Sequence, residues 1–321
     1  MNDHDDGTAV LGAEIQATFQ ALRPRLLGVA YGLLGSLDEA EDVVQDAWLR
    51  LRSAEAAGGD EIRDVTGWLV VTVSRLALDV LRSARHRREE YVGPWLPEPV
   101  LTGPVLTGPA LTGAVLTGTA PDPAERVTLD ESMSMAMLVV LESLSPAERT
   151  AFVLHDVFGL TFAEVGEAVG RSPAACRQLA ARARAHVASR APRFDVDPSE
   201  HRRVVDAFAR ACLGDDMDAL VALLDPDVVL RSDGGGRVRA GRRPVSGSAK
   251  VARLLSGLRR FGRYELVPAV VNGWPGLLRY RDGRLVAVIG LTVADGRITA
   301  VDMVLNPEKL ARVTRADETR R

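Results

Sequence analysis

A five-residue unit, repeated four times with little change between residues 101 and 120, divides this chain. The stretch reads LTGPV-LTGPA-LTGAV-LTGTA. A spacing of five matches neither the helical repeat of about 3.6 residues nor the alternation of a strand, and Gly and Pro interrupt both structures. The repeat therefore predicts a flexible linker over residues 91–121, and the sequences on either side of it must fold separately.

The sequence before the linker, residues 15–90, has the pattern of packed helices. Between Asp38 and Leu51 apolar residues recur at helical spacing on one stripe. The other face is acidic, with five acids and no base from Asp38 to Asp46. A second helix passes through Trp68 and Leu81 and ends in a basic cluster. That cluster consists of Arg82, Arg85, His86, Arg87 and Arg88.

The segment LTFAEVGEAVGRSPAACRQLAARARAHV, within residues 122–190, predicts two short helices joined by a tight turn. Thr161 and Glu164 have the spacing of a capping box at the start of the first helix, and Gly170 ends it. Ser172 then caps a second helix that has Pro173 at its first position, where the missing N–H costs nothing. This arrangement is typical of a helix-turn-helix.

The second of these helices has an outer face that suits DNA. Its buried stripe is predicted to be apolar, and between Arg171 and Arg190 there are five arginines and no acid. Arg and Gln side chains can form paired hydrogen bonds with guanine and adenine edges in a major groove. The alternative is an ordinary solvated helical hairpin. The candidate DNA-binding residues are Arg171, Ser172, Arg177, Gln178, Arg182 and Arg184.

After a short connection, the sequence pattern of residues 200–311 is no longer helical alone. Helical patterns over about 201–213 and 216–224 lead to a strand at 228–231, a helix at 248–261 and further strands up to 305. The pairs Asp282-Gly283 and Asp295-Gly296 lie between β-rich runs and predict hairpin turns. We therefore expect an α+β domain after the two helical ones.

Charge and cysteine content narrow the class of protein further. The net charge is only -3, so a nucleic-acid site must come from local clustering of basic residues. Cys176 and Cys212 lie far apart and in no metal-binding spacing, which favours buried, reduced thiols. The acidic start MNDHDDG is unlike a signal peptide, and no apolar run approaches about 20 residues. We expect a cytoplasmic protein with no membrane contact, no metal and no cofactor.

Together, the motifs resemble a bacterial extracytoplasmic-function (ECF) RNA polymerase sigma factor. DEAEDVVQDAWLRL at 38–51 resembles region 2.2, WLVVTVSRLALDVLRSARHRR at 68–88 resembles regions 2.3 and 2.4, and residues 144–187 resemble region 4. The resemblance implies two partners: core RNA polymerase, through its β′ clamp helices and β flap, and promoter DNA. Residues 15–90 would be the region 2 helical bundle and 122–190 the region 4 helix-turn-helix.

The resemblance also assigns roles to residues. The polymerase-binding residues would be Asp38, Glu41, Asp42 and Gln45. Arg82, Arg85, Arg87 and Arg88 would contact DNA at the minus-ten element, and the helix-turn-helix would read the minus-thirty-five element. Where such factors often carry Gly-Thr, this sequence has Ala174-Ala175, and it has Gln178 where Ser is common. The promoter that it reads is therefore expected to differ.

Three further motifs resemble a subgroup of these factors, the SigJ type, which carries a C-terminal SnoaL-like domain with a cone-shaped α+β fold. They are Trp95-Leu-Pro-Glu-Pro99, Asp233-Gly-Gly-Gly236 and Asn306-Pro-Glu-Lys-Leu310. The resemblance implies that the extra domain regulates the sigma regions in cis. The implied regulatory contacts are Trp95, Pro97, Glu98, Asp233, Gly234, Gly235, Gly236, Asn306 and Pro307.

An alternative remains open for the third domain, because SnoaL-like folds also house polyketide cyclases and ketosteroid isomerases. Such chemistry needs a titratable group in an apolar pocket. Asp302, amid apolar strand residues, is the best candidate base, and Asp233 is the next. His201, at a helix start, is expected to be exposed. Since a fold does not carry a function, we predict no catalytic residue and no enzyme, with a small-molecule sensor as the other possibility.

Overall fold

The computed structural model describes residues 3–57, 62, 64–102, 133–190, 197–258 and 262–318, without the side chains of 3–13, 84–89, 190 and 314–318. Within these residues the chain forms two compact units, which are treated separately below. The first contains residues 3–86 and 141–187, and the second contains 87–102, 133–140 and 188–318. The repeats from residue 103 onward lie outside the described residues.

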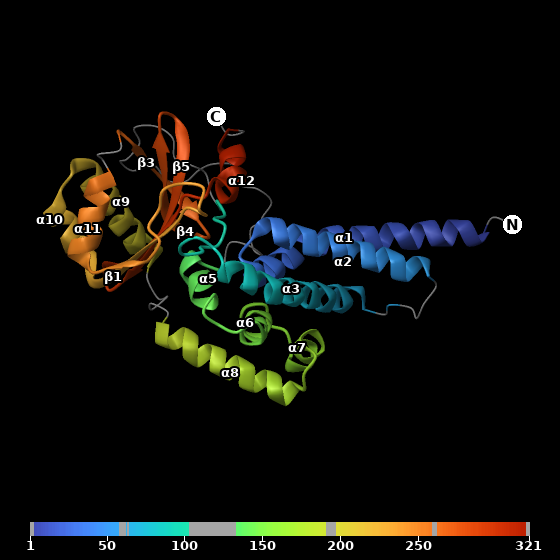
Figure 1. Ribbon diagram of the computed structural model, residues 1–321. Helices are drawn as coiled ribbons and strands as arrows, with labels where there is room; N and C mark the ends of the chain where they lie inside the picture. Colours follow the sequence, from blue (N-terminus) through green and yellow to red (C-terminus); the bar gives the residue numbers. More distant parts are fainter. Residues whose placement is uncertain are drawn as a thin grey trace. The chain divides into compact units, whose positions relative to one another are not determined.

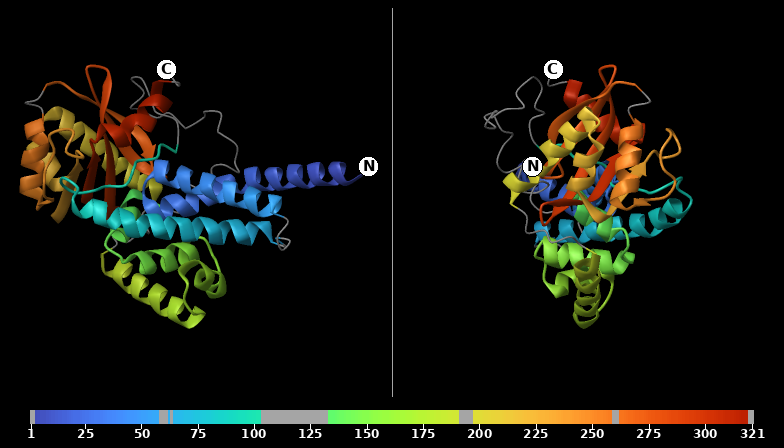
Figure 2. Two further views of the ribbon diagram at one scale, coloured as in Figure 1. Left: turned by 45° about the vertical axis from the view of Figure 1, so that its right-hand side comes forward. Right: turned by 90° about the vertical axis from the view of Figure 1, so that its left-hand side faces the viewer.

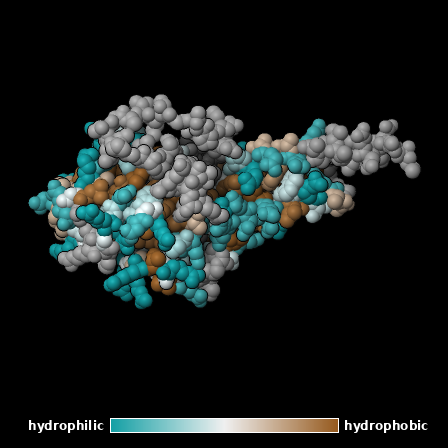
Figure 3. Space-filling view, turned by 90° about the horizontal axis from the view of Figure 1, so that it is seen from above, coloured by the Kyte–Doolittle hydropathy of each residue, from teal (hydrophilic) through white to brown (hydrophobic). Residues whose placement is uncertain are grey.

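The first unit is helical, as expected. Figures 1 and 2 show α1, α2 and α3 running side by side, and the rings of Phe19 in α1 and Trp48 in α2 stack at 4.6 Å. Figure 3 shows mostly hydrophilic residues on the face of these helices that it draws. The elements are α1 (Asp3–Leu34), α2 (Leu37–Ala56), α3 (Val65–Glu89), α6 (Pro146–Phe152), the π-helical turn η1 (Val153–Val157), α7 (Phe162–Val169) and α8 (Pro173–Arg190).

The second unit is built around one mixed sheet of six strands in the order β2-β1-β6-β5-β4-β3. β1 runs parallel to β6, and every other neighbouring pair is antiparallel. The strands are β1 (Leu224–Asp233), β2 (Val245–Ser246), β3 (Glu265–Val271), β4 (Trp274–Arg281), β5 (Arg284–Ala294) and β6 (Arg297–Val304). The helices are α5 (Met135–Leu141), α9 (Pro198–Gly214), α10 (Met217–Leu223), α11 (Ser248–Gly257) and α12 (Pro307–Glu318).

Each face of this sheet has its own hydrophobic core. Helices α9, α10 and α11 cover one face, where Phe208, Leu220 and Met303 are buried together, whereas α12 packs on the other face (Figure 1). The second core brings Leu96, from the segment before the linker, against Leu310 of α12. The sheet therefore buries both of its faces, and part of the covering comes from residues far away in the sequence.

Tight turns connect the antiparallel strands. Asp282-Gly283 joins β4 to β5 and Asp295-Gly296 joins β5 to β6, each with both residues at positive φ between 50° and 72°, which confirms the two predicted hairpins. Asn272-Gly273 makes a third turn of this kind between β3 and β4, at φ of 50° and 77°. This pair is as strong a hairpin signal as the other two.

The described helices include none with the length and apolarity to cross a membrane.

Candidate functional site

Helix α2 presents the predicted polymerase-binding residues on its outer side. Ser36 caps the helix by accepting a hydrogen bond from the Glu39 amide at 3.3 Å, and an apolar stripe from Ala40 to Leu51 is buried. Asp38, Asp42 and Gln45 are exposed, whereas Glu41 is half-buried. The structure thus places three of the four residues on one accessible face.

The same face also carries an exposed hydrophobic residue, Leu49, that the sequence pattern did not predict to be exposed. Leu49 is 54% exposed, the largest exposed fraction among the large hydrophobic side chains described. Positions 38, 42, 45 and 49 follow the helical i, i+4, i+7, i+11 pattern, so Leu49 continues the stripe of Asp38, Asp42 and Gln45. An exposed apolar side chain beside exposed polar ones matches the apolar core and polar rim of protein interfaces.

The basic end of α3 is described only in part. Arg82 is exposed and pairs with Asp79, one turn earlier, at 3.2 Å. The side chains of Arg85, Arg87 and Arg88 lie outside the described residues. Their role at the minus-ten element stays a prediction.

The helix-turn-helix forms as its caps predict. Thr161 and Glu164 make both hydrogen bonds of the capping box at the start of α7. Gly170 ends α7 in the left-handed region at φ 70°, and the Ser172 hydroxyl accepts from the Ala175 amide at 3.3 Å at the start of α8. A side chain at Gly166 would place its Cβ 2.7 Å from the Arg171 carbonyl, so the close approach of the two helices needs glycine there.

The basic residues on the outer face of α8 and just before it fall into two groups. Arg171, Arg177 and Gln178 are exposed, and the Arg177 guanidinium lies 5.5 Å from the centre of the Phe162 ring. Arg182 and Arg184 are also exposed but are held by acids of their own domain. Arg182 pairs with Glu148 at 2.9 Å, and Arg184 pairs with Asp156 at 2.7 Å. The Ser145 hydroxyl and then Arg182 lower the pKa of Glu148.

Three arginines link helices α1–α3 to helices α6–α7 within the first unit. Arg149 is fully buried, pairs with Glu142, and donates from Nε and Nη2 to the Gly32 carbonyl at 3.3 Å. Arg75 donates to the Glu167 carbonyl at 3.0 Å, and Arg25 donates to the Phe158 carbonyl at 3.5 Å. No local sequence pattern indicates the three bonds to backbone carbonyls, because their partners lie 117, 92 and 133 positions apart.

In the second unit, Asp233 is the centre of a buried cluster. Its Oδ1 accepts from the Tyr91 hydroxyl at 2.6 Å, and its Oδ2 accepts from the Leu96 amide at 2.9 Å. Lys309 of α12 completes the cluster by pairing with Oδ2 at 2.8 Å. The Lys309 ammonium also lies over the rings of Trp95, at 4.0 Å, and Tyr91, at 5.1 Å. We call Tyr91, Trp95, Leu96, Asp233 and Lys309 the linker clamp.

The glycines after Asp233 give the clamp its close contacts. Gly235 has φ of 59°, and a Cβ there would lie 2.4 Å from the Asn306 amide nitrogen. A Cβ on Gly234 would lie 2.6 Å from the Val238 carbonyl, and Gly236, at φ 70°, faces Val92. Asn306 donates to the Tyr91 hydroxyl at 3.0 Å and accepts from the Glu308 amide at 3.1 Å, so it also caps α12 beside Pro307. Burial and then the Asp233 hydrogen bond raise the pKa of Tyr91.

The extended segment that follows Trp95 continues along the sheet. Leu96, Pro97 and Glu98 are buried, while Trp95 is half-buried. The Asn272 amide donates to the Val100 carbonyl at 2.8 Å, and Leu101 forms a β-bridge with Val271 at the end of β3. The three motifs that the sequence singled out therefore meet in one place.

The candidate catalytic groups of the third domain are engaged elsewhere. Asp302 is buried, pairs with Arg231 at 2.8 Å, and shares a sheet face with Gly290, opposite the face that α9–α11 cover. Burial raises its pKa and Arg231 opposes that shift. The expectation that His201 is exposed was wrong, because the first turn of α9 packs on the sheet: His201 is 3% exposed and its Nε2 bonds the Leu291 carbonyl at 3.0 Å. Burial lowers its pKa.

The thiols and the metal-binding side chains are the other reactive groups of the described residues. Cys176 and Cys212 are both buried and free, as expected, and burial raises the pKa of Cys212 to about 12. Across the described residues, no group of three or more His, Cys, Asp or Glu side chains comes together in a way that could hold a metal ion.

Comparison with known proteins places these features in a family. The Sigma-70 region 2 model matches residues 18–87, and the model for Sigma-70, region 4 matches residues 134–187. ECF RNA polymerase sigma factor SigJ of Mycobacterium tuberculosis (strain ATCC 25618 / H37Rv) is 42% identical over 306 residues, 91% of each protein. The probable ECF sigma factor SigI of the same strain is 35% identical over 310 residues, 97% of each protein.

A solved structure agrees with the sequence relatives. The crystal structure of the M. tuberculosis SigJ has a TM-score of 0.70 and 40% identity, covering 92% of this chain and 98% of that one. The predicted sigma regions and the α+β domain after them are thereby confirmed. The chain therefore belongs to the extracytoplasmic-function RNA polymerase sigma factors, and it is a non-enzymatic, SigJ-like initiation factor that directs core RNA polymerase to promoters.

Proposed function

We propose that the C-terminal domain controls promoter activity in cis by binding the segment that leads into the linker. The observation that carries this proposal is the linker clamp, in which Asp233 and Lys309 of the third domain hold Tyr91 and Leu96. The linker joins the two promoter-reading domains. Fixing its first residues therefore limits the positions that region 4 can reach from region 2.

The surfaces described above supply the other contacts. The exposed face of α2, with Asp38, Asp42 and Gln45, docks on the β′ clamp helices of core polymerase, and region 4 engages the β flap. Arg177 and Gln178 of α8 read the minus-thirty-five element, with Arg171 near the phosphates. Arg182 and Arg184 reach DNA only when they leave Glu148 and Asp156. The protein works where polymerase and promoter are, in the cytoplasm.

A run-off transcription assay tests the control in cis. Full-length protein and a chain that ends at residue 195 are compared on one promoter across a range of core polymerase concentrations. We expect the shorter chain to transcribe with a different yield at every concentration, because the linker is no longer held. A filter-binding titration of core polymerase separates altered control from altered docking. Equal yields from the two chains throughout the range would contradict the proposal.

A further inference from the structure

One stretch of the third domain contains basic residues and no acidic ones. Between Gly234 and Tyr264 the sequence has nine Lys or Arg residues and neither Asp nor Glu, although the whole chain has a net charge of -3. Such local clustering of positive charge is what sequence-independent binding to nucleic acid requires, because it neutralises phosphates. The stretch lies beyond both sigma regions, whose matches end at residue 187.

The structure places four of these basic residues on one exposed loop. Residues 234–244, which we call the arginine loop, connect β1 to β2, the edge strand of the sheet. Its exposed basic side chains are those of Arg237, Arg239, Arg242 and Arg243. Helix α11 follows β2 directly and packs against β1 (Figure 1), so the exposed Lys250 and Arg253 of α11 add positive charge beside the same edge.

Hydrogen bonds hold the arginine loop at both ends. The amides of Arg237 and Val238 donate to the Gly234 carbonyl at 2.9 and 3.2 Å, which forms a turn directly after β1. Further along the loop, the Gly241 amide donates to the Ser232 hydroxyl at 2.9 Å and ties the loop back to β1. A loop that is fixed in this way loses less conformational entropy when a partner binds to its side chains.

Two arginines of the loop are available to an external anion. Arg237 pairs with Glu308 at 2.8 Å, whereas no described acidic side chain forms an ion pair with Arg242 or Arg243. These two residues are adjacent in the sequence and both are exposed. Their guanidinium groups therefore make a small, accessible concentration of positive charge.

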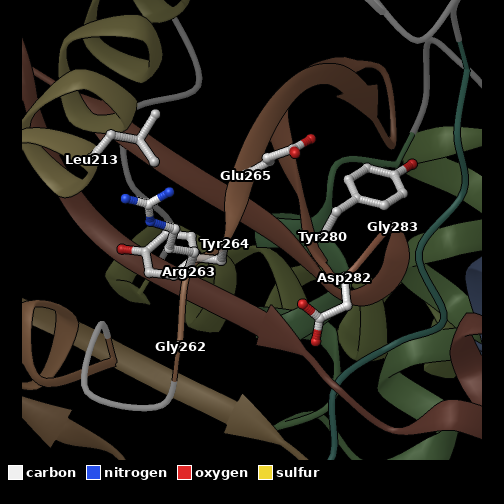
Figure 4. Close-up of a pocket in the computed structure, with 8 residues that line it drawn as sticks. All are labelled: Leu213, Gly262, Arg263, Tyr264, Glu265, Tyr280, Asp282 and Gly283. Atoms are coloured by element: carbon white, nitrogen blue, oxygen red, sulfur yellow. The ribbon is translucent and has the colours of Figure 1, made fainter.

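The rest of the basic stretch is closer to acidic groups. Asp227 is exposed on β1, the strand against which α11 packs. At the other end of the stretch, Arg263 lines a pocket that Glu265 and Asp282 also line (Figure 4). The positive charge that acids do not offset is therefore concentrated on the arginine loop.

The composition of the arginine loop favours the phosphates of double-stranded DNA over other nucleic-acid contacts. The loop has no aromatic residue on which an unpaired base could stack, and no Asn or Gln that could read an adenine edge. Arginine matches phosphate oxygens through paired N–H donors. Because the chain is a sigma factor and works at promoters, duplex DNA is present wherever it acts.

We propose that the arginine loop binds the phosphate backbone of duplex DNA through Arg242 and Arg243, as a DNA contact in addition to those of regions 2 and 4. A phosphate contact carries no sequence information, so it adds affinity for every promoter alike and increases the dependence on salt. The proposal does not require that the linker clamp controls transcription.

Fluorescence anisotropy of the full-length protein with a labelled duplex of arbitrary sequence, over a range of KCl concentrations, tests the proposal. The variant Arg242→Ala/Arg243→Ala removes both guanidinium groups. We expect this variant to bind the duplex roughly tenfold or more weakly at low salt. The slope of the logarithm of affinity against the logarithm of salt concentration should fall in magnitude by about 2, one for each lost phosphate contact.

Two further variants separate a phosphate contact from other effects. Arg242→Lys/Arg243→Lys keeps the charge, and lysine still contacts phosphate as a point charge, so duplex binding and salt slope should stay near those of the parent. The matched control is Arg202→Ala/Arg203→Ala on α9, which packs on β3 and β4, at the opposite end of the sheet from β2. This control removes the same charge and should bind the duplex as the parent does. Circular dichroism shows that each variant is folded.

Three results would overturn the inference. One is duplex binding by the Arg242/Arg243 alanine variant that equals that of the parent, which would leave an acidic protein as the partner of the loop. Another is an equal loss in the Arg202/Arg203 control, which would show a general effect of net charge. The third is a loss confined to a single-stranded oligonucleotide of the same sequence, which would assign the loop to unpaired nucleic acid.

Discussion

At the scale of single residues, the loss of either of two ion pairs in the first unit should lower stability by different amounts, because the arginine of one pair is buried and the arginine of the other is exposed to water. The side chains of Arg149 and Glu142 are 2% and 21% exposed, whereas those of Arg182 and Glu148 are 60% and 22% exposed. Removing one partner of a buried pair costs about 3–5 kcal/mol, and an exposed pair contributes about 1 kcal/mol or less. We expect Arg149→Ala to lower the stability of the helical unit several times more than Arg182→Ala, measured by urea unfolding of the full chain. Equal losses would show that Gly32 and Glu142 contribute little to the contact.

His201 predicts a pH dependence of the C-terminal domain. Burial lowers its pKa in the folded state, and its Nδ1 is enclosed without a partner. The unfolded chain therefore binds a proton near pH 6.5 that the folded domain does not take up, so stability is present above that pH and is lost as the pH falls. The slope can reach about 1.4 kcal/mol per pH unit below it. Urea unfolding at pH 7.5 and 5.5, followed by Trp fluorescence, measures this loss.

The matched variant is His201→Gln, whose amide can still donate to the Leu291 carbonyl but does not titrate. We expect the difference in stability between the two pH values to shrink in this variant. If the parent and the variant lose the same stability on acidification, another group is responsible.

At the scale of elements, helix α2 combines charge and apolar surface on one face. Asp42→Lys should weaken binding to core polymerase, mainly by slowing association and most strongly at low salt, because rim charges steer encounter. Leu49→Ala should weaken binding by raising the dissociation rate, as expected of an apolar anchor. Surface plasmon resonance with immobilised core polymerase separates the two rates. Asp218→Lys, an exposed acid in the first turn of α10, is the control, and a matching loss there would point to a general charge effect.

Replacing two different arginines of helix α8 should change DNA binding in two different ways. Arg177→Ala is expected to cost about 1–3 kcal/mol and to relax one position of the minus-thirty-five element. Arg184→Ala should weaken every sequence alike and lower the dependence on salt, because Arg184, once it leaves Asp156, contacts a phosphate and not a base edge. Fluorescence anisotropy with single-base variants of the element measures both. An Arg177 variant that discriminates bases as the parent does would mean that α8 meets the groove with another face.

The elements that the sequence predicted best are those specified by local chemistry. The Thr161 and Glu164 capping box, Ser172 with Pro173, and the Asp-Gly turns each act over a few residues, and each is found where the pattern put it. The contacts that were missed join distant residues. Tyr91 donates to Asp233, 142 positions away, and His201 bonds a carbonyl 90 positions downstream, so no local pattern could indicate either contact.

At the scale of the whole molecule, the covalent attachment of the third domain is enough to keep the linker clamp occupied without a high affinity. A covalently linked domain has an effective concentration of order millimolar, and at that concentration a contact with a Kd near ~10 µM is about 99% occupied. The linker clamp needs only modest strength to hold residues 91–102. Under the proposed control in cis, a ligand, a second protein or polymerase itself would release the clamp by competing for the same segment.

The clamp can be opened without removing the domain. Asp233→Asn leaves the buried Lys309 ammonium without its anion, and this should cost about 3–5 kcal/mol, concentrated on the segment that Asp233 holds. In the parent protein the Leu96 amide donates to Asp233 at 2.9 Å. We expect this amide to exchange its hydrogen faster in the variant, while the amides of β5 stay protected. Promoter yield should change in the same direction as in the chain that ends at residue 195.

The matched control is Glu308→Gln. Glu308 lies on the same helix as Lys309 and forms an exposed ion pair with Arg237, in which the side chains of Glu308 and Arg237 are 65% and 64% exposed. Exposed pairs contribute little, so both exchange at Leu96 and promoter yield should stay as in the parent. The decisive case is Asp233→Asn with fast exchange at Leu96 and an unchanged promoter yield. That combination would show that the clamp opens without consequence for transcription, and the control in cis would then have to act through another surface of the third domain.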